Sequence, residues 1–329
     1  MKKVLQITIG LLLSAVFAWL AIRNIQWKEF ILTLQSGKYW WYILPSSVLF
    51  LASFFSRAIR WGYFLEPIQQ VSNQKLYSAL MIGYMGNNVL PLRLGELLRA
   101  YALNRTTGIS KSAGLATIVV ERLVDIAGLL LFLIVAVIVS PIPPRYRFIT
   151  LMIGAVAVLI LAVLLLLTFF DQQMTKLLQM IFRFLPEFSM SKITQIVQSF
   201  IQGLHGLRQT SNYWKILLHT CIMWVLYASS TYCMLVAFNF NHLYGMDFWA
   251  AIVILLIGTV GVLIPSSPGF IGTYEGVMVF ALAIYSVPKP SALGFAIVIH
   301  LVNYIPVTLI GLYFFLREGL RFREIPDST

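Results

Sequence analysis

Long uninterrupted runs of apolar residues constrain this chain more than any other feature. Residues 4–22, 148–170, 213–238 and 292–316 each approach or exceed the roughly 20 residues with which an α-helix crosses about 30 Å of hydrocarbon. Charged residues make up 11% of the chain, whereas a soluble domain carries about 25%. The alternating segments of about 10 residues that build a membrane barrel do not dominate. The sequence therefore predicts an all-α polytopic membrane protein that crosses the cell membrane several times.

The basic residues predict the orientation of the chain. The net charge is +12, but Lys and Arg flank the apolar runs and no nucleic-acid-binding motif is present, which argues against a nucleic-acid partner. We expect both termini in the cytoplasm, because most basic residues then lie inside. The 23–39 loop, with three basic residues outside, argues mildly the other way. The first apolar run lacks a small-residue cleavage site, so we expect it to remain as the first span.

Two apolar stretches are interrupted by helix-breaking residues. The first covers 76–103 and contains Asn88, Pro91 and Gly95; the second covers 248–285. The breaks in the second stretch are Pro265, Pro268, Gly269 and Gly272. Irregular backbone at membrane depth is tolerated only where it is buried in protein or lines a polar cavity. We therefore expect two broken segments, each either a re-entrant hairpin or a pair of short spans.

The order of these elements repeats within the chain. Two spans, a broken segment and a further span occupy residues 1–147, and the same order occupies 148–329. Each half crosses the membrane an odd number of times, so the second half is inverted relative to the first. Inverted repeats with broken segments in matching positions are typical of a transporter whose site lies near the bilayer midplane. The prediction is one membrane domain with about six full spans and two broken hairpins, or eight or more membrane segments.

Residues 171–212 form the longest polar region of the chain. Apolar residues recur there at helical spacing, so the region is not a plain linker. We expect either amphipathic helices on the cytoplasmic membrane surface or a helical hairpin packed against the bundle.

Several ionisable side chains fall inside apolar segments, where a central charge costs roughly 2.5–3.5 kcal/mol. Around the first break, Arg93, Glu96 and Arg99 share one helix face. Glu121 and Asp125 share a face of a long span that follows. The other candidate site residues are Arg57 and Arg60, which end the second predicted span, together with Arg122, Asn88 and Glu275.

Two interpretations of these charges stay open. In the first they are internal ion pairs that hold the bundle together, with Glu121 or Asp125 satisfying an arginine such as Arg57, Arg60 or Arg93. In the second they bind a polar ligand beside the broken backbone. The net positive charge near the first break favours an anionic headgroup such as a phosphate, which arginine binds in bidentate fashion. A further polar face, on the last span, carries His300, Asn303 and Tyr304.

The motifs also resemble a known family. They are Asn88-x-x-Pro91-x-Arg93-x-Gly95-Glu96-x-x-Arg99, Glu121-Arg122-x-x-Asp125, Pro265-x-x-Pro268-Gly269-x-x-Gly272-x-x-Glu275 and Arg57-x-x-Arg60-Trp61. Their combination resembles the lysylphosphatidylglycerol synthase transmembrane-domain family over nearly the whole chain. That family includes the flippase half of the multiple peptide resistance factor and stand-alone relatives. Only about a dozen residues follow the last span, so the resemblance implies the translocation module and not the synthase.

We therefore expect a lipid flippase that moves a phospholipid or lipid-linked headgroup across a bacterial or archaeal cytoplasmic membrane, and not an enzyme. Its partners would be membrane lipids with phosphate-containing headgroups, and a homo-oligomer is left open. No ATP-binding motif is present, and the two Cys and four His show no metal-site spacing, so we expect no cofactor and no metal. The alternatives are a membrane-embedded lipid-headgroup transferase and a scaffold subunit of a lipid-modifying complex.

Overall fold

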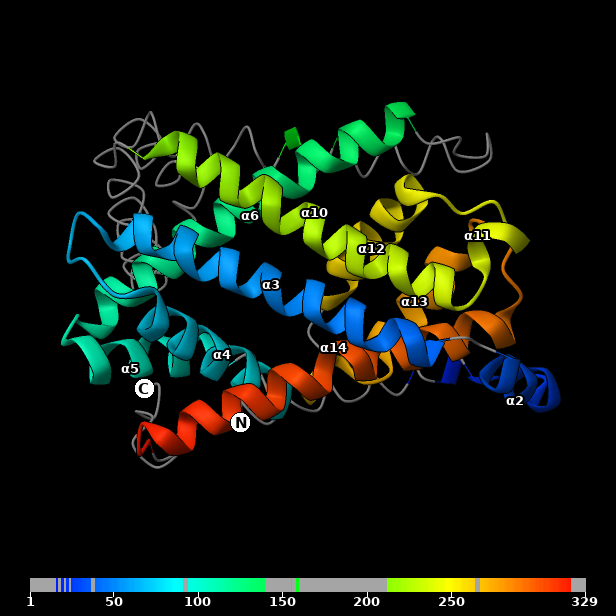
Figure 1. Ribbon diagram of the computed structural model, residues 1–329, viewed down its shortest axis with the longest axis horizontal. Helices are drawn as coiled ribbons and strands as arrows, with labels where there is room; N and C mark the ends of the chain where they lie inside the picture. The colour runs from blue at the N-terminus through cyan, green and yellow to red at the C-terminus, as the bar shows by residue number, and fades with distance from the viewer. Residues whose placement is uncertain are drawn as a thin grey trace, which may run out of the picture.

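The computed structural model describes residues 16, 19–20, 22–23, 25–36, 39–90, 94–139, 155, 158–159, 212–263 and 267–320. Within these ranges every regular element is helical, as predicted. Three of the described helices are long and apolar enough to cross a membrane: α3 (Tyr39–Leu65), α10 (Tyr213–Ala237) and α14 (Lys289–Arg317). They run along the long axis of the molecule (Figure 1). The predicted spans at 213–238 and 292–316 are confirmed. Most of 4–22, most of 148–170 and the 171–212 region apart from Asn212 lie outside the described residues.

Helix α3 is longer than the sequence predicted. The second span was expected to stop near residue 55, with Arg57 and Arg60 at its end, but the helix continues for a further ten residues to Leu65. It continues because both arginines are buried and paired with acidic side chains of a neighbouring helix, so their charge does not end the apolar segment. The helix stops before Pro67, whose ring disfavours helical backbone at the residue that precedes it.

Both predicted breaks are present. The first separates α4 (Asn73–Val89) from α5 (Gly95–Thr107). The second separates α12 (Phe248–Leu263) from α13 (Thr273–Ala283), with the short 3₁₀ turn η2 (Pro268–Phe270) between them. At 1.5 Å per residue the longest of these limbs is about 25 Å, which is shorter than the roughly 30 Å of bilayer hydrocarbon. The limbs α4 and α5 lie toward one end of α3, and α12 and α13 toward the other (Figure 1). Of the predicted breaks, Pro91 and Pro265 lie outside the described residues.

A ten-residue helix near the start of the chain was not predicted. The 23–39 segment was interpreted as a loop, but it contains α2 (Trp27–Ser36). The loop interpretation rested on the basic residues and overlooked that Trp27 and Ile31, four residues apart, place apolar side chains on one helix face. Both remain at least half exposed. The other side of α2 packs on α14, where the hydroxyls of Thr33 and Ser291 lie 3.1 Å apart.

Helices α3 and α10 pack against each other in antiparallel fashion. Near one end, Ser56 Oγ lies 2.9 Å from His219 Nδ1, and further along Ser46 meets Ser230. The two serines bond reciprocally: Ser46 Oγ donates to the Ser230 carbonyl at 3.2 Å, and Ser230 Oγ donates to the Ser46 carbonyl at 3.0 Å. The pairing of each serine with the other's backbone makes this contact nearly two-fold symmetric.

The helix contacts among α3 to α6, the first part of the chain, repeat among α10 to α14, the second part. Helix α3 contacts α4 as α10 contacts α12, and α4 contacts α5 as α12 contacts α13. Helix α5 packs on α6 (Lys111–Val139) as α13 packs on α14. Between the two parts, α14 packs on α4 and α6 packs on α12. A short helix, α11 (Phe240–Leu243), connects α10 to α12.

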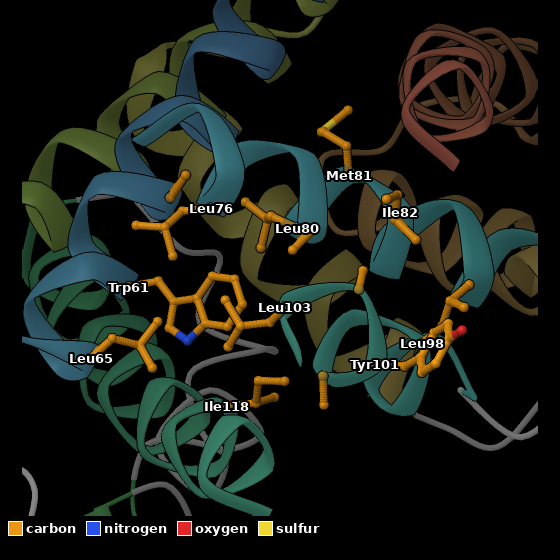
Figure 2. Packing of buried hydrophobic residues seen from close by; sticks show 14 of the residues in the cluster. Trp61, Leu65, Leu76, Leu80, Met81, Ile82, Leu98, Tyr101, Leu103 and Ile118 are labelled. Carbon is orange, nitrogen blue, oxygen red and sulfur yellow. The ribbon is translucent and has the colours of Figure 1, made fainter. Parts of the chain in front are cut away.

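The larger apolar core lies among α3, α4, α5 and α6. Figure 2 shows the Trp61 indole of α3 between side chains of the neighbouring helices. Trp61 has no exposed surface, and its indole N–H donates to Thr117 Oγ1 of α6 at 3.0 Å. The residues around it in Figure 2 are Leu65, Leu76, Leu80, Leu103 and Ile118. This core fixes the position of α5 relative to α3 and α6, the three helices that carry most of the predicted charges.

Glycines allow the two limbs of each broken segment to approach closely. A Cβ atom on Gly95 of α5 would lie 2.0 Å from the Gly83 carbonyl oxygen of α4, so only glycine fits there. The second segment has the same arrangement, because a Cβ on Gly261 of α12 would lie 2.7 Å from Val277 of α13. A third close approach joins α14 to α4, where a Cβ on Gly311 would lie 2.4 Å from the Met81 carbonyl oxygen. Helix α14 also contains a proline, Pro306.

Candidate functional site

Three helices bring together seven of the ten predicted site residues in one ionic network. We call this network the arginine cluster; its members are Arg57 and Arg60 of α3, Glu96 and Arg99 of α5, and Glu121, Arg122 and Asp125 of α6. Arg93, the eighth, lies outside the described residues. Asn88 and Glu275 lie in a separate polar region described below. The predicted ion pairs of Glu121 and Asp125 with arginines of α3 are present.

Glu121 is the centre of the arginine cluster. Its carboxylate is completely buried, and each of its oxygens accepts a hydrogen bond from a guanidinium. Arg57 Nη1 donates to Oε1 at 2.7 Å, and Arg99 Nη2 donates to Oε2 at 2.6 Å. Arg99 also reaches Oε1 from Nη1 at 3.2 Å, so it binds the carboxylate with two nitrogens. A buried carboxylate with this set of partners stays charged and fixes both arginines.

Asp125 lies one helical turn further along α6 and extends the network. Its Oδ1 accepts from Arg60 Nη2 at 2.5 Å, and its Oδ2 lies 2.9 Å from Arg57 Nη1. Arg60 also donates from Nη1 to Thr220 Oγ1 of α10 at 3.0 Å. The arginine cluster is therefore held from both parts of the chain. Thr117, Glu121 and Asp125 recur every four residues on α6, and this spacing was the sequence signal that could have added Thr117 to the prediction.

Aromatic faces complete the walls of the arginine cluster. The Arg99 guanidinium carbon lies 3.7 Å from the centre of the Trp61 ring, and that of Arg57 lies 5.7 Å from the Tyr84 ring. Contacts of this kind stabilise a desolvated cation by about 2 kcal/mol. Sequence reasoning missed Tyr84 and Thr220, because neither carries a charge and both are distant from the arginines in sequence.

The arginine cluster reaches the surface at one edge. Arg122 Nη2 lies 2.9 Å from Glu96 Oε1, and the two side chains are 34% and 33% exposed. Glu96 and Arg99 were expected side by side on one helix face, but they do not pair with each other. Arg99 turns inward to Glu121, whereas Glu96 turns outward to Arg122. Arg122 and Glu96 thus form the accessible rim of an otherwise buried network.

The charges in the arginine cluster do not balance. Four guanidinium groups face three carboxylates, which leaves one positive charge in excess. The Nε–H groups of Arg57, Arg60 and Arg99 are buried without an acceptor among the described residues. Buried charges in proteins are ordinarily paired, and buried donors ordinarily have acceptors. The cluster is suited to an additional anion that approaches by way of the rim.

The two broken segments meet at the end of α4. Tyr304 of α14 donates its hydroxyl to the Asn88 carbonyl at 3.3 Å, and Asn88 Nδ2 donates to Thr308 Oγ1 at 2.8 Å. Gly269 of η2, with φ 68°, lies against both groups: a Cβ on it would be 2.7 Å from the Tyr304 ring and 3.2 Å from the Asn88 oxygen. Asn88 and the second break therefore belong to one polar contact, whose hydrogen bonds involve no member of the arginine cluster.

Glu275 lies at the start of α13, in the same region. Its Oε2 accepts from the Gly272 N–H at 2.6 Å, which satisfies a free donor at the beginning of the helix. Its Oε1 lies 2.5 Å from His300 Nδ1 of α14. His300 was noticed in the sequence only as part of a polar face with Asn303 and Tyr304, and nothing in the sequence linked that face to Glu275.

Comparison with known proteins identifies the family. Residues 7–311 match the family described as the lysylphosphatidylglycerol synthase TM region. The chain belongs to this family. Membership in the lysylphosphatidylglycerol synthase TM-region family, together with the apolar helices, makes it a helical membrane protein.

Individual relatives are consistent with this assignment. The chain is 25% identical to a UPF0104 membrane protein of Methanothermobacter thermautotrophicus, over 84% of this chain and 83% of the relative. It is 23% identical to a UPF0104 membrane protein of Methanocaldococcus jannaschii, over 94% of each. It is also 25% identical to glycosyltransferase AglD of Haloferax volcanii, over 82% of this chain but 47% of that relative. No solved structure matches the chain.

Proposed function

We propose that this membrane protein is a lipid flippase, which moves a lipid with a phosphate-containing headgroup between leaflets without changing it chemically. The observation that carries the proposal is the excess guanidinium in the arginine cluster, which is buried except at the rim of Arg122 and Glu96. An anion that enters at this rim would supply the missing negative charge. Family membership supports the proposal, because the family is described as the TM region of lysylphosphatidylglycerol synthase, a name that refers to a phospholipid.

A phosphate suits this site better than a carboxylate or a chloride ion would. A guanidinium binds a phosphate through two parallel hydrogen bonds, and the tetrahedral headgroup offers acceptors to more than one arginine. Arg122 is the arginine that a headgroup would contact directly, since its side chain is accessible. Arg57, Arg60 and Arg99 would act from behind it, through their charge and through fixed ion pairs that prevent the site from collapsing.

We further propose that the chain consists of two inverted repeats, in which α3, α4, α5 and α6 correspond to α10, α12, α13 and α14. The matching helix contacts described above support this correspondence. The antiparallel and reciprocal contact of Ser46 with Ser230 lies between the two corresponding helices, where a pseudo-two-fold axis would pass. In such transporters the polar pathway runs between the repeats, where broken helices meet. Here that place is the contact of Asn88 with Gly269 and Tyr304.

A reconstitution experiment tests the flippase proposal. The purified protein is placed in vesicles of phosphatidylethanolamine and phosphatidylglycerol that contain a trace of fluorescent phosphatidylglycerol, and a membrane-impermeant quencher reports the fraction in the outer leaflet. We expect labelled lipid to change leaflet faster than in protein-free vesicles, with its mass unchanged. Chemically altered lipid would favour the membrane-embedded transferase instead, and a panel of phospholipid headgroups in which none moves would reject the flippase.

Replacing Arg122 with glutamine is expected to slow this movement by about tenfold or more, while the free energy of unfolding changes by less than about 1 kcal/mol. The slower movement follows because a hydrogen bond between the Arg122 guanidinium and the headgroup phosphate would contribute about 1.5–3 kcal/mol to headgroup binding. The small change in unfolding follows because an ion pair that is one-third exposed contributes little to stability. Leaflet exchange and chemical unfolding in detergent measure the two quantities separately.

Arg105→Gln provides the matched control. Arg105 is an exposed arginine on α5, the helix that carries Glu96, and it lies outside the arginine cluster. We expect the control variant to move lipid at the wild-type rate. Equal rates for wild type, Arg122→Gln and Arg105→Gln would show that the rim does not bind the headgroup.

A further inference from the structure

The Glu275–His300 pair differs from the arginine cluster in the kind of positive charge that it contains. His300 Nδ1 lies 2.5 Å from Glu275 Oε1, and both side chains are 13% exposed. Among the described residues, His300 is the basic side chain within ion-pair distance of this carboxylate; no Lys or Arg joins it. Glu121 and Asp125, by contrast, face arginines, whose charge is permanent at any physiological pH.

The surroundings make a net charge on this pair unfavourable. Apolar side chains of the same two helices pack next to it, including Met278, Ile299 and Val302. With a neutral imidazole the pair carries one negative charge, and with a protonated imidazole it carries none. A buried charge without a counter-charge is strongly disfavoured. Neutralisation of Glu275 therefore requires a mobile cation, and the imidazole provides a place for a proton.

The hydrogen bonds define where that proton binds. A carboxylate only accepts hydrogen bonds, so Nδ1 of His300 carries the hydrogen that it donates to Glu275 Oε1. This leaves Nε2 of the neutral imidazole as the acceptor of a second proton. Uptake forms one N–H bond at Nε2 from hydronium and releases water, and the reverse step returns the proton. The Glu275 bond to the Gly272 N–H keeps the carboxylate in place through both steps.

Within the part of the chain that the structure describes, few other groups near the pair can titrate. The Tyr274 ring of α13 packs on the imidazole at a tilt, with ring centres 4.6 Å apart, and Tyr304 of α14 lies edge-on at 5.9 Å. Helices α12 and η2 contain no ionisable side chain, and from α4 the contacting residue is Asn88, which does not titrate. Tyr42 of α3 and Tyr232 of α10 border the adjoining apolar cluster. Tyrosines stay protonated near neutral pH, so the pair itself is the group that responds.

The pair also lies where a change of charge would reach the lipid pathway. Tyr304, one turn along α14 from His300, bonds to the carbonyl of Asn88 at the end of α4. The same carbonyl lies against Gly269 in the second break. We propose that Glu275 and His300 form a proton-binding site that couples the movement of lipid to the proton gradient. This inference rests on the proposed flippase function, because a coupling site requires a transported substrate.

Proton binding can be tested without any assumption about transport. The full-length protein is labelled with ¹⁵N-histidine in lipid nanodiscs, and the His300 signals are assigned by their loss in His300→Gln. We expect the His300 ¹⁵N signals of the wild type to change with pH as Nε2 takes up and releases the proton. In Glu275→Gln the titration should shift by about tenfold or more in proton affinity, because the carboxylate that stabilises the imidazolium is gone. A His300 signal that does not change with pH, or that titrates identically in Glu275→Gln, would overturn the site.

Coupling is tested in the same vesicles with an imposed pH gradient. We expect the imposed gradient to change the wild-type rate of leaflet exchange. It should also shift the steady-state ratio of labelled lipid between the leaflets by up to about tenfold for each pH unit, the limit set by one proton per lipid. His300→Gln retains a hydrogen bond to Glu275 but cannot bind the proton, so its rate should not depend on the gradient. The control, His242→Gln, replaces an exposed histidine of α11 and should behave as wild type.

The two tests separate the two proposals. If His300 titrates with Glu275 but no lipid moves at any pH, the flippase proposal fails and the proton site stands. If lipid moves and the His300→Gln variant responds to the gradient as wild type does, the coupling role is wrong and the flippase proposal stands.

Discussion

Replacing Glu121 with glutamine is expected to lower the free energy of unfolding by about 3–5 kcal/mol. The carboxylate is completely buried between Arg57 and Arg99. Glutamine would leave the buried Arg99 without its carboxylate partner, and Arg57 would have to share Asp125 with Arg60. Loss of one partner from a buried ion pair is more damaging than loss of the whole pair, because the remaining charge is desolvated and unpaired. Chemical unfolding in mixed micelles measures this change, and we expect lipid movement to be lost as well.

Two further variants show whether unpaired charge is the cause. Glu96→Gln removes a carboxylate at the exposed rim and should change the stability by less than about 1 kcal/mol. The double variant Glu121→Gln with Arg99→Gln removes the guanidinium that Glu121→Gln leaves without its carboxylate, so it should recover part of the stability without recovering transport. Glu121→Gln with wild-type stability would contradict the arrangement of the arginine cluster described here.

Replacing Gly95 with alanine is the second change with a large expected effect, about 3 kcal/mol of destabilisation. The added Cβ would lie 2.0 Å from the Gly83 carbonyl oxygen and 2.4 Å from the Asn87 amide nitrogen, and neither backbone atom can turn aside as a side chain can. Helix α5 would have to move away from α4 and carry Arg99 with it. We therefore expect less folded protein, a lower free energy of unfolding and loss of lipid movement.

The matched control for this prediction is Gly294→Ala in α14. A Cβ at Gly294 would meet the side chains of Leu34 and Thr33 at 3.6 Å, an ordinary contact distance. This variant should fold and unfold as wild type does, or be slightly more stable, because alanine is the better helix former. Similar stability for Gly95→Ala and Gly294→Ala would mean that the α4 and α5 limbs are less closely packed than described.

The apolar runs and their breaks predicted much of the described fold, because membrane-length helices and proline–glycine interruptions leave a direct mark on sequence. The predicted end of α3 was wrong for a physical reason. An Arg-x-x-Arg pattern after an apolar run is typical of a membrane boundary, and only the packing of α6 shows that Arg57 and Arg60 are neutralised inside the bundle. Helix α2 was missed because its ten residues are too short and too polar to resemble a span.

Most of the arginine cluster was predicted by residue type, and the pairing of Glu121 and Asp125 with arginines of α3 was one of the two interpretations. The partners of Glu96 and Arg99 were not predicted. Spacing along α5 put Glu96 and Arg99 on one face, yet each turns to a different residue of α6, and a single helix does not reveal that choice. Glu275 was predicted without its partner, because His300 lies 25 residues away on another helix. Arg93 stays a prediction, as do the membrane orientation of the termini and the role of the 171–212 region.

Pro306 gives α14 a joint between two contacts that matter for the proposed mechanism. Its nitrogen has no hydrogen to donate to the Val302 carbonyl, so the helix is weakest at this turn. His300 lies on one side of the joint, and Gly311, packed against the Met81 carbonyl, lies on the other. A change of charge at His300 would therefore bend α14 at this turn and act on the Tyr304–Asn88 hydrogen bond, while Thr308 and Gly311 keep the other half of α14 against α4. A membrane-long helix with one such joint confines a local rearrangement to the half that contains the proton.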